Sequence, residues 1–391
     1  MANDFIIKDS NGKDRVYRGV EYVTLITTSG NKVVFREPTE TDLRTYGEYY
    51  VKALDYDGNI VKQEKLNAGD VFTLPTAPDH AGMEFKQWVS TSTIVDNAIT
   101  VENKDITVYP VYIGTNNINE FSFEFTKKTG KSVTLNMDGT KDWGDGTSDN
   151  STSHTYSDYG KYTVSCDGTT ITASSSSGIF GQYGNVYGNH FTCIGAKLAN
   201  VTKIPDYAFQ NCKNLKYVIF PNSSCSIGAS AFQYCYNLQN VIIPETVTSV
   251  GSYAFQYCYG LQNILILCSS DTLSSNLMRY CYSVKDVLLP NAVTQILSSF
   301  MEYCYNVKRL KFPSNVSTIS SYAFRSCFGL IEYDFTDCSA IPTLSNTNAF
   351  SDINYSCKIY VPDELYDTWI TATNWATYAS CIYKASERGS V

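Results

Sequence analysis

The sequence predicts a multidomain, mainly β protein, with small N-terminal β modules, a β-sandwich, and then a solenoid of stacked repeats that ends in a helical cap. Three observations predict this order. Cysteines recur every 23 residues from Cys212 to Cys327, and apolar and polar side chains alternate over short runs before residue 175. The length of 391 residues also exceeds the usual single-domain range.

Composition and charge argue against several classes of function. A net charge of −8 disfavours nucleic acid as a partner, because phosphate binding needs clustered Lys and Arg. No run approaches 18 apolar residues, so membrane insertion is not expected, and the first 20 residues lack the pattern of a secretory signal. The three histidines form no Cys/His cluster at zinc-ligand spacing. We therefore expect no metal and no cofactor.

The N-terminal third is predicted to hold two small β units. Residues 1–38 alternate in FIIKD, YVTLITT and KVVF, and they are either an attachment region or a hairpin that completes the next domain. Residues 39–114 resemble the Listeria-Bacteroides repeat, a β-grasp-like module of bacterial surface proteins, through Leu74-Pro75, Gly82, Phe85, Trp88 and the strand ITVYPVY. Trp88 is expected to fill the core of this small module.

A third unit follows the short segment TNN. Residues 118–174 resemble a polycystic-kidney-disease-type domain, an Ig-like β-sandwich, through WGDGT (143–147), His154, Tyr156 and YGKYTV (159–164). The DG pair is expected to supply positive-φ residues to a tight turn. Asp145 is interpreted as a turn aspartate that accepts backbone N–H bonds, rather than as a calcium or catalytic group.

The repeats themselves predict a solenoid. In LKYVIFP the apolar residues Leu215, Val218 and Phe220 must share one interior, and equivalent residues return 23 positions later. Each coil therefore contributes a short strand to a parallel sheet, and a proline such as Pro221 ends that strand. The pair Ala231-Phe232 is placed on a tight turn of the opposite wall.

The form AF-x-x-C-x-x-L-x-x-I-x-I-P resembles the BspA-like branch of leucine-rich repeats, and we assign residues 192–360 to such a solenoid. The resemblance implies a scaffold for recognition. Buried, reduced thiols that donate weakly to turn carbonyls are the expected state of the structural ladder. This ladder consists of Cys212, Cys235, Cys258, Cys281, Cys304 and Cys327.

Two tyrosine rows flank the cysteines and are candidate partner-binding residues, with self-packing between coils as the alternative. They are Tyr234, Tyr257, Tyr280 and Tyr303, and Tyr236, Tyr259, Tyr282 and Tyr305. A second candidate is an aliphatic stripe on the outward side of the strands, which needs a cover from a neighbouring domain or from a partner. It consists of Ile219, Ile242, Leu265 and Leu288.

Residues 361–391 are expected to form the cap, with a helix that starts at Pro362-Asp363 and buries Leu365, Trp369 and Trp375. The resemblances imply a non-enzymatic recognition or adhesion protein. We expect a bacteriophage virion component, a tail or head fibre that contacts a host-surface glycan or protein receptor and other virion proteins, with a homo-oligomer as an option. The alternatives are a secreted bacterial cell-surface adhesin and a structural decoration protein. An enzyme would need paired carboxylates in a cleft, and Glu332 and Asp334 are expected on an open surface instead.

Overall fold

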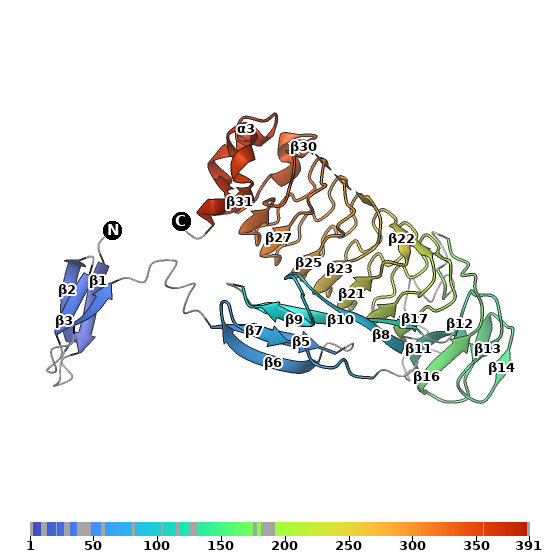
Figure 1. Ribbon diagram of the computed structural model, residues 1–391. Coiled ribbons are helices and arrows are strands. Elements are labelled where there is room, and N and C mark those ends of the chain that lie inside the picture. The colour runs from blue at the N-terminus through green and yellow to red at the C-terminus, as the bar shows by residue number, and fades with distance from the viewer. Residues whose placement is uncertain are drawn as a thin grey trace.

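The computed structural model describes residues 48–388 except 56–58, 80–82, 103–104, 115–117, 126–131, 175–177, 181–191 and 355, and near the N-terminus the backbone of four strands (Figure 1). These strands form two antiparallel hairpins, β1 (Asn3–Lys8) with β2 (Asp14–Val20) and β3 (Tyr22–Ile26) with β4 (Lys32–Arg36). The expected connector at 115–117 lies outside the described residues.

The first module is a mixed four-stranded sheet in the order β6-β5-β10-β8, with a two-stranded β7-β9 sheet beside it. Its strands are β5 (Glu48–Leu54), β6 (Ile60–Asn67), β7 (Val71–Thr73), β8 (Met83–Ser90), β9 (Ala98–Thr100) and β10 (Ile106–Gly114). Trp88 lies in the module core with Phe72 and Val108, and its indole N–H donates to the carbonyl of Pro75 at 3.1 Å. This is the core role expected for Trp88.

The second module is built on the long strands β11 (Asn119–Phe125) and β16 (Gly160–Cys166), which pair in an antiparallel fashion. Four short strands complete it, namely β12 (Ser132–Thr134), β13 (Lys141–Asp142), β14 (Ser148–Asp149) and β15 (Ser153–Thr155). Gly144 and Gly146 adopt φ values of 76° and 89°, so the glycines supply the positive-φ positions of the turn. The Asp145 carboxylate accepts the Thr147 N–H at 3.1 Å, which confirms that it is a turn aspartate.

The second module and the solenoid are one continuous body. β11 pairs with β16 on one side and with β17 (Thr192–Lys197) on the other, and β17 continues in parallel to β19 (Tyr217–Ile219). The same hydrophobic core runs from Phe121 to Ile382. The module therefore covers the first coil and prevents an open sheet edge at that end.

The solenoid has strands on two walls, whereas the sequence predicted one strand in each coil. The first wall continues from β19 with β21 (Asn240–Ile243), β23 (Asn263–Ile266), β25 (Asp286–Leu288), β27 (Arg309–Lys311), β29 (Glu332–Asp334), β31 (Lys358–Val361) and β32 (Ile382–Lys384). The second wall holds β18 (Lys203–Ile204), β20 (Cys225–Ile227), β22 (Val247–Val250), β24 (Thr272–Leu273), β26 (Gln295–Ile296), β28 (Thr318–Ile319) and β30 (Thr343–Leu344). Pairing is parallel and in register, as Ile242 opposite Leu265 and Leu265 opposite Leu288 show.

The turns that close each coil carry the predicted cysteine ladder. The five ladder thiols from Cys235 to Cys327 each donate to the backbone carbonyl 26 residues earlier, at Sγ···O distances of 3.1–3.3 Å, as Cys281 does to Phe255. All thirteen cysteines are free, and the ladder is buried. Burial raises the pKa of the Cys327 thiol to about 12, so these thiols stay protonated donors.

The C-terminal cap is less helical than predicted. It consists of the short helices η2 (Asp363–Leu365), α3 (Tyr366–Trp369), η3 (Trp375–Cys381) and η4 (Ala385–Glu387), and η1 (Thr347–Phe350) precedes it in the last coil. Trp369 and Trp375 are buried with ring centroids 5.3 Å apart, and the Trp375 indole N–H donates to Pro342 O at 2.6 Å. The helix does begin at Asp363 after Pro362, but β32 then returns to the first wall and extends its sheet.

Candidate functional site

The aliphatic stripe on the first wall is covered by the first module. Leu54, Val89, Tyr109 and Val111 of the module form one buried cluster with Leu265, and Ile242 and Leu288 pack against this cluster. Leu265 is fully buried and Ile219 is 4% exposed. Of the stripe Ile219, Ile242, Leu265 and Leu288, the module therefore covers Leu265 completely and Ile242 and Leu288 in part. The expected cover from a neighbouring domain is confirmed for Leu265, and the interpretation of Leu265 as a contact for an external partner is wrong.

A buried hydrogen bond joins the two sheets at this interface. The Tyr109 hydroxyl donates to the Asp286 carboxylate at 2.8 Å, across 177 positions of sequence. Burial, together with the negative charge of Asp286, raises the pKa of the Tyr109 phenol. The phenol therefore stays protonated at neutral pH and holds the module at a fixed place along the solenoid.

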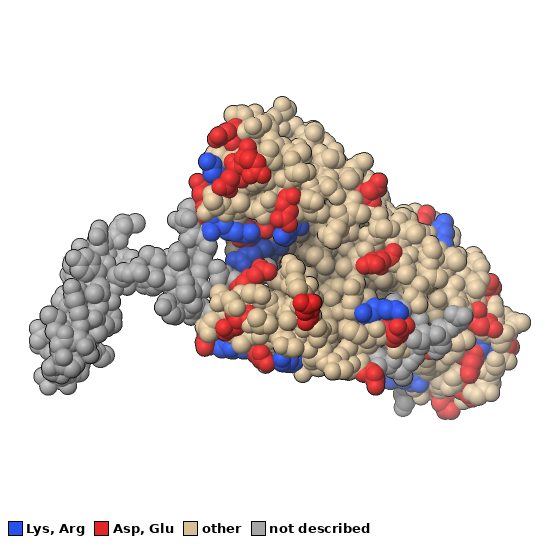
Figure 2. Space-filling model, in the orientation of Figure 1, with Lys and Arg blue, Asp and Glu red and all other residues tan. Residues whose placement is uncertain are grey.

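Beyond this contact the two sheets diverge and leave a cleft of about 1970 Å³. Figure 1 shows the module beneath the strands β21 to β27, and Figure 2 shows the hollow between them with Lys and Arg side chains at its mouth. The first wall forms one side with Lys285, Arg309 and Lys311, and the module forms the other with Ser90 to Thr93.

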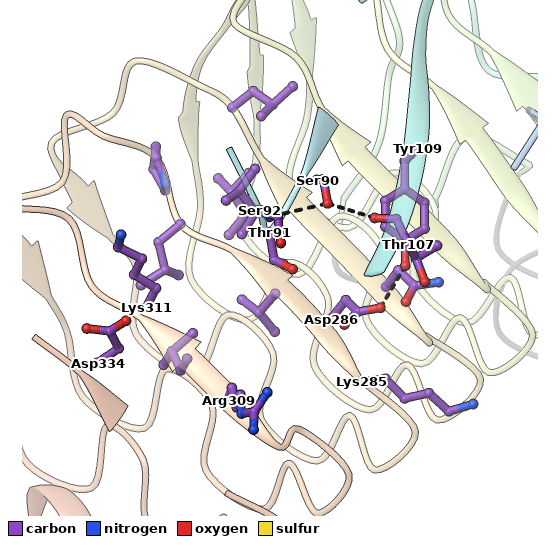
Figure 3. Close-up of a pocket in the computed structure, with 18 of the residues that line it drawn as sticks. Ser90, Thr91, Ser92, Thr107, Tyr109, Lys285, Asp286, Arg309, Lys311 and Asp334 are labelled. Atoms are coloured by element: carbon purple, nitrogen blue, oxygen red, sulfur yellow. Dashed lines mark hydrogen bonds between the residues drawn. The ribbon is translucent and has the colours of Figure 1, made fainter. Parts of the chain in front are cut away.

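The module side of the cleft is a run of hydroxyl side chains, Ser90, Thr91, Ser92 and Thr93 (Figure 3). The Ser90 hydroxyl donates to Thr107 O at 2.9 Å and accepts the Ser92 N–H at 3.3 Å, which fixes the turn. Ser92 is 7% exposed, and its own Oγ has no hydrogen-bond partner in the structure. A buried hydroxyl without a partner is unfavourable unless a ligand completes it.

The solenoid side of the cleft carries charges of both signs, and four of its cations lie on two consecutive coils. Lys285 precedes β25, and Lys308, Arg309 and Lys311 lie one coil further on. Arg309 approaches Glu332 at 3.5 Å and Lys311 pairs with Asp337 at 2.8 Å. Lys285 and Lys308 are exposed. Lys285 and Lys308 thus occupy equivalent exposed positions in two coils, in a lining that also holds Asp286, Glu332, Asp334 and Asp337.

Glu332 and Asp334 lie at the end of this cleft and not on an open surface, so that expectation was wrong. The Arg388 guanidinium contacts both carboxylates and is 2.8 Å from Asp334 Oδ2. Burial of Asp334 opposes ionisation, but hydrogen bonds from Thr336 and the charge of Arg388 outweigh it and lower the pKa of this carboxyl. A general acid needs a raised pKa, so Asp334 is held in the wrong state for that role.

The two predicted tyrosine rows lie on the turns that close each coil, beside the cysteine ladder. We call these eight tyrosines the tyrosine strip. Rings of one row are nearly parallel, with centroids 4.7–4.8 Å apart between Tyr234 and Tyr303 and 5.0–5.2 Å apart between Tyr236 and Tyr305. Rings of the two rows meet edge to face. The strip remains partly open to solvent, and Tyr259 and Tyr305 are 36% and 37% exposed.

The stacking decides which chemistry the strip offers. Each interior ring has its two faces against the rings of the coils above and below, so the faces are not free to stack on a sugar. Ring edges and hydroxyl groups remain for a partner. The self-packing alternative is therefore confirmed for the ring faces, and the contact role of the ring edges stays a prediction.

Backbone conformation at the inner row is unusual. Tyr234, Tyr257, Tyr280 and Tyr303 have φ values of 65°, 61°, 66° and 66°, a region that disfavours large side chains. Asn211 and Ser326 occupy the equivalent positions in the flanking coils, also with positive φ. The four central coils thus carry tyrosine where the same backbone accepts smaller polar residues.

Beside the inner row lies a buried charged group. Glu302 is 2% exposed, its carboxylate is 2.7 Å from the Arg279 Nε, and Arg325 is 3.6 Å away. Gln256 holds the equivalent position in an earlier coil. The Arg279 guanidinium lies 4.7 Å from the Tyr280 ring centroid and makes a cation–π contact with the strip.

The sequence interpretation missed the cleft, because the module and the strands that form it are far apart in the chain. Two local signals were present, the hydroxyl run STST at 90–93 and the basic run KRLK at 308–311. Within the described residues no group of three or more His, Cys, Asp or Glu has a metal-binding arrangement. Among those same residues no helix is long and apolar enough to cross a membrane.

Comparison with known proteins identifies the repeats. The family model for the BspA type leucine rich repeat region matches six copies at residues 202–331. No curated protein matches the chain. Solved structures with similar parts include leucine-rich repeat proteins from Eubacterium ventriosum (23% identity, 40% of this chain and 42% of that chain, TM-score 0.36) and Bacteroides ovatus (22%, 48% and 53%, TM-score 0.38).

A leucine rich cell surface protein from Faecalibacterium prausnitzii is similar at 18% identity over 55% of this chain and 84% of that chain, with a TM-score of 0.30. The chain spans about half the length of the Eubacterium and Bacteroides proteins. Residues 202–331 are therefore BspA-type leucine-rich repeats in a mainly β solenoid.

Proposed function

We propose that the protein is a non-enzymatic recognition protein and that the tyrosine strip binds a protein partner. The observation that carries the proposal is that four consecutive coils each place a tyrosine in left-handed backbone, with a second tyrosine row beside them. The interior is already filled by Phe and Cys side chains, so core packing does not require these rings. Unfavourable local conformations that persist over several coils suggest a functional surface.

Tyrosine edges and hydroxyl groups suit a protein interface. A stacked tyrosine has little rotamer freedom left to lose on binding, and it offers apolar area and a hydrogen-bonding tip together. Successive rings of one row, about 4.8 Å apart, repeat this arrangement along the solenoid. A partner that contacts several coils would therefore bind a surface that is already ordered, and binding would cost little side-chain entropy.

The proposed setting is an exposed biological surface, either a bacterial cell envelope or a bacteriophage fibre. Both settings need an elongated scaffold that carries a contact surface away from its attachment point. Residues 1–38 are proposed as the attachment region, to other virion proteins in the second case. Deletion of residues 1–38 should leave receptor binding intact and abolish incorporation into the particle or envelope, and incorporation of the shortened chain would reject the attachment role.

The contact role is tested by Tyr259→Ser together with Tyr282→Ser in the outer row, with Tyr159→Ser as the matched control, because Tyr159 is 47% exposed on another module. Binding of fluorescent protein to target cells is measured by flow cytometry. Loss of two interface tyrosines should weaken binding by about tenfold or more. Unchanged binding in the double variant would overturn the proposal, and reducing sugar released from a glycan panel would overturn the non-enzymatic assignment.

A further inference from the structure

We propose that the cleft between the first module and the first solenoid wall binds an acidic oligosaccharide, a chain of hydroxylated sugars that carry carboxylates. This site is separate from the tyrosine strip and does not depend on it. Its two sides come from Ser90 to Thr93 and from the strand face around β25 and β27. Figure 3 shows Ser90, Thr91 and Ser92 of the module together with Arg309 and Lys311 of the solenoid, and Lys285 extends away from the hydroxyl run.

The hydroxyl side matches the sugar ring. Ser92 supplies a nearly buried Oγ without a partner, and the bond from its N–H to Ser90 Oγ fixes the backbone around it. Sugar hydroxyls both donate and accept, so one of them can complete the serine hydroxyl. Tyr49 also lines the cleft and is partly exposed.

The cationic side matches carboxylates. Lys285 and Lys308 occupy the same position in neighbouring coils, which stack about 4.8 Å apart. Lys311 and Arg309 pair with Asp337 and Glu332, and Asp286 accepts the Tyr109 hydroxyl, so Lys285 and Lys308 are the exposed cations of this face that a ligand can use. A ligand with two acidic groups at a matching spacing would meet this pair of lysines, which supplies local charge complementarity.

Size and lining favour an oligosaccharide over a peptide. The cleft volume of about 1970 Å³ exceeds the ordinary range for small-molecule sites, and therefore fits an oligomer. Peptide recognition uses apolar pockets for side-chain anchors. Among the described lining residues, the aromatic side chains other than Tyr49 are buried, with Tyr109 at 4% and Phe312 at 0% exposure.

The experiment is calorimetric titration of the full chain with a hexagalacturonate, its methyl ester and a hexaglutamate peptide. The free acid should bind, its affinity should fall between about 50 mM and about 300 mM NaCl, and the ester should bind at least about tenfold more weakly. Equal binding of acid and ester would overturn the role of the cations. Preferential binding of hexaglutamate would overturn the sugar assignment, and no binding of the acid would overturn the proposal.

The substitutions are chosen from residues that occupy equivalent positions in successive coils. Lys285→Gln with Lys308→Gln introduces the residue that the chain itself has at Gln239 and Gln262, so the fold should persist. This pair should weaken hexagalacturonate binding by about tenfold or more, whereas Lys216→Gln, the same position in the first coil, should leave it unchanged. Ser92→Ala should weaken binding without lowering the melting temperature. A loss of stability with unchanged affinity would show a structural serine and contradict the site.

Discussion

The contact between the first module and the solenoid can be broken by one substitution, Leu265→Asp. Leu265 is fully buried between the two sheets, in a cluster with Leu54, Val89, Tyr109 and Val111. In the docked state the new carboxylate would lie in this mainly apolar cluster without a positively charged partner. The module should therefore separate from the strand face rather than bury the charge.

The magnitude follows from two contributions. Burial of a leucine side chain contributes about 2 kcal/mol, and an uncompensated buried carboxylate costs several kcal/mol more. A combined penalty on the order of 5 kcal/mol shifts the ratio of docked to separated module by more than about a thousandfold. Because the second module and solenoid share a separate core, they should remain folded.

The assay uses a reporter thiol at the interface, Val89→Cys, in a chain with Cys381→Ser, since the other twelve cysteines are buried. Maleimide labelling of Cys at position 89 should be slow in this background and fast after Leu265→Asp. Ile331→Asp is the matched control, because Ile331 lines the same cleft but is 41% exposed. Equal labelling rates for the parent and the Leu265→Asp chain would refute the docked arrangement.

Three further predictions test other parts of the structure. A disulfide-exchange reagent should react promptly with no more than the thiol of Cys381 in the native chain and with all thirteen after denaturation, and early reaction of the ladder would contradict burial. Glu302→Ala should lower the free energy of unfolding by about 3 kcal/mol in urea titration, because it leaves two arginines without their buried anion. The control Glu245→Ala, at an exposed site, should have little effect. The pKa of Asp334 is lowered in the folded state, so its stabilising contribution is present above the unfolded pKa and is lost as the pH falls through the folded pKa. Asp334→Asn should therefore reduce the loss of stability between about pH 5 and pH 2. An unchanged pH profile of stability would contradict the pairing of Asp334 with Arg388.

Regular features of the solenoid could be predicted from the sequence because they repeat. The 23-residue period placed Cys235 and Cys258 in equivalent environments, and both donate to a carbonyl of the preceding coil. The second strand of each coil was missed although its signal was present. Ile204, Ile227 and Val250 recur with the same period, but each strand is only two to four residues long and too short for visible alternation.

Contacts between distant segments could not be predicted in the same way. The aliphatic residue Leu265 showed that the strand face needed a cover, but nothing local to it identifies Tyr109 and Val111 as that cover. Ring orientation in the tyrosine strip was also inaccessible, because the sequence gives residue types and spacing but not the χ angles that direct ring faces toward neighbouring coils. Prediction of the cleft needs both the contacts between distant segments and the orientations of the side chains.

The central claim is that successive coils hold equivalent side chains in register and so create continuous surfaces. A crystal structure of the full chain tests it most directly. We predict parallel rings with centroids near 4.8 Å along Tyr234, Tyr257, Tyr280 and Tyr303, above a line of thiols that each contact the preceding coil. Rings that splay apart, or thiols displaced from a common line, would contradict it.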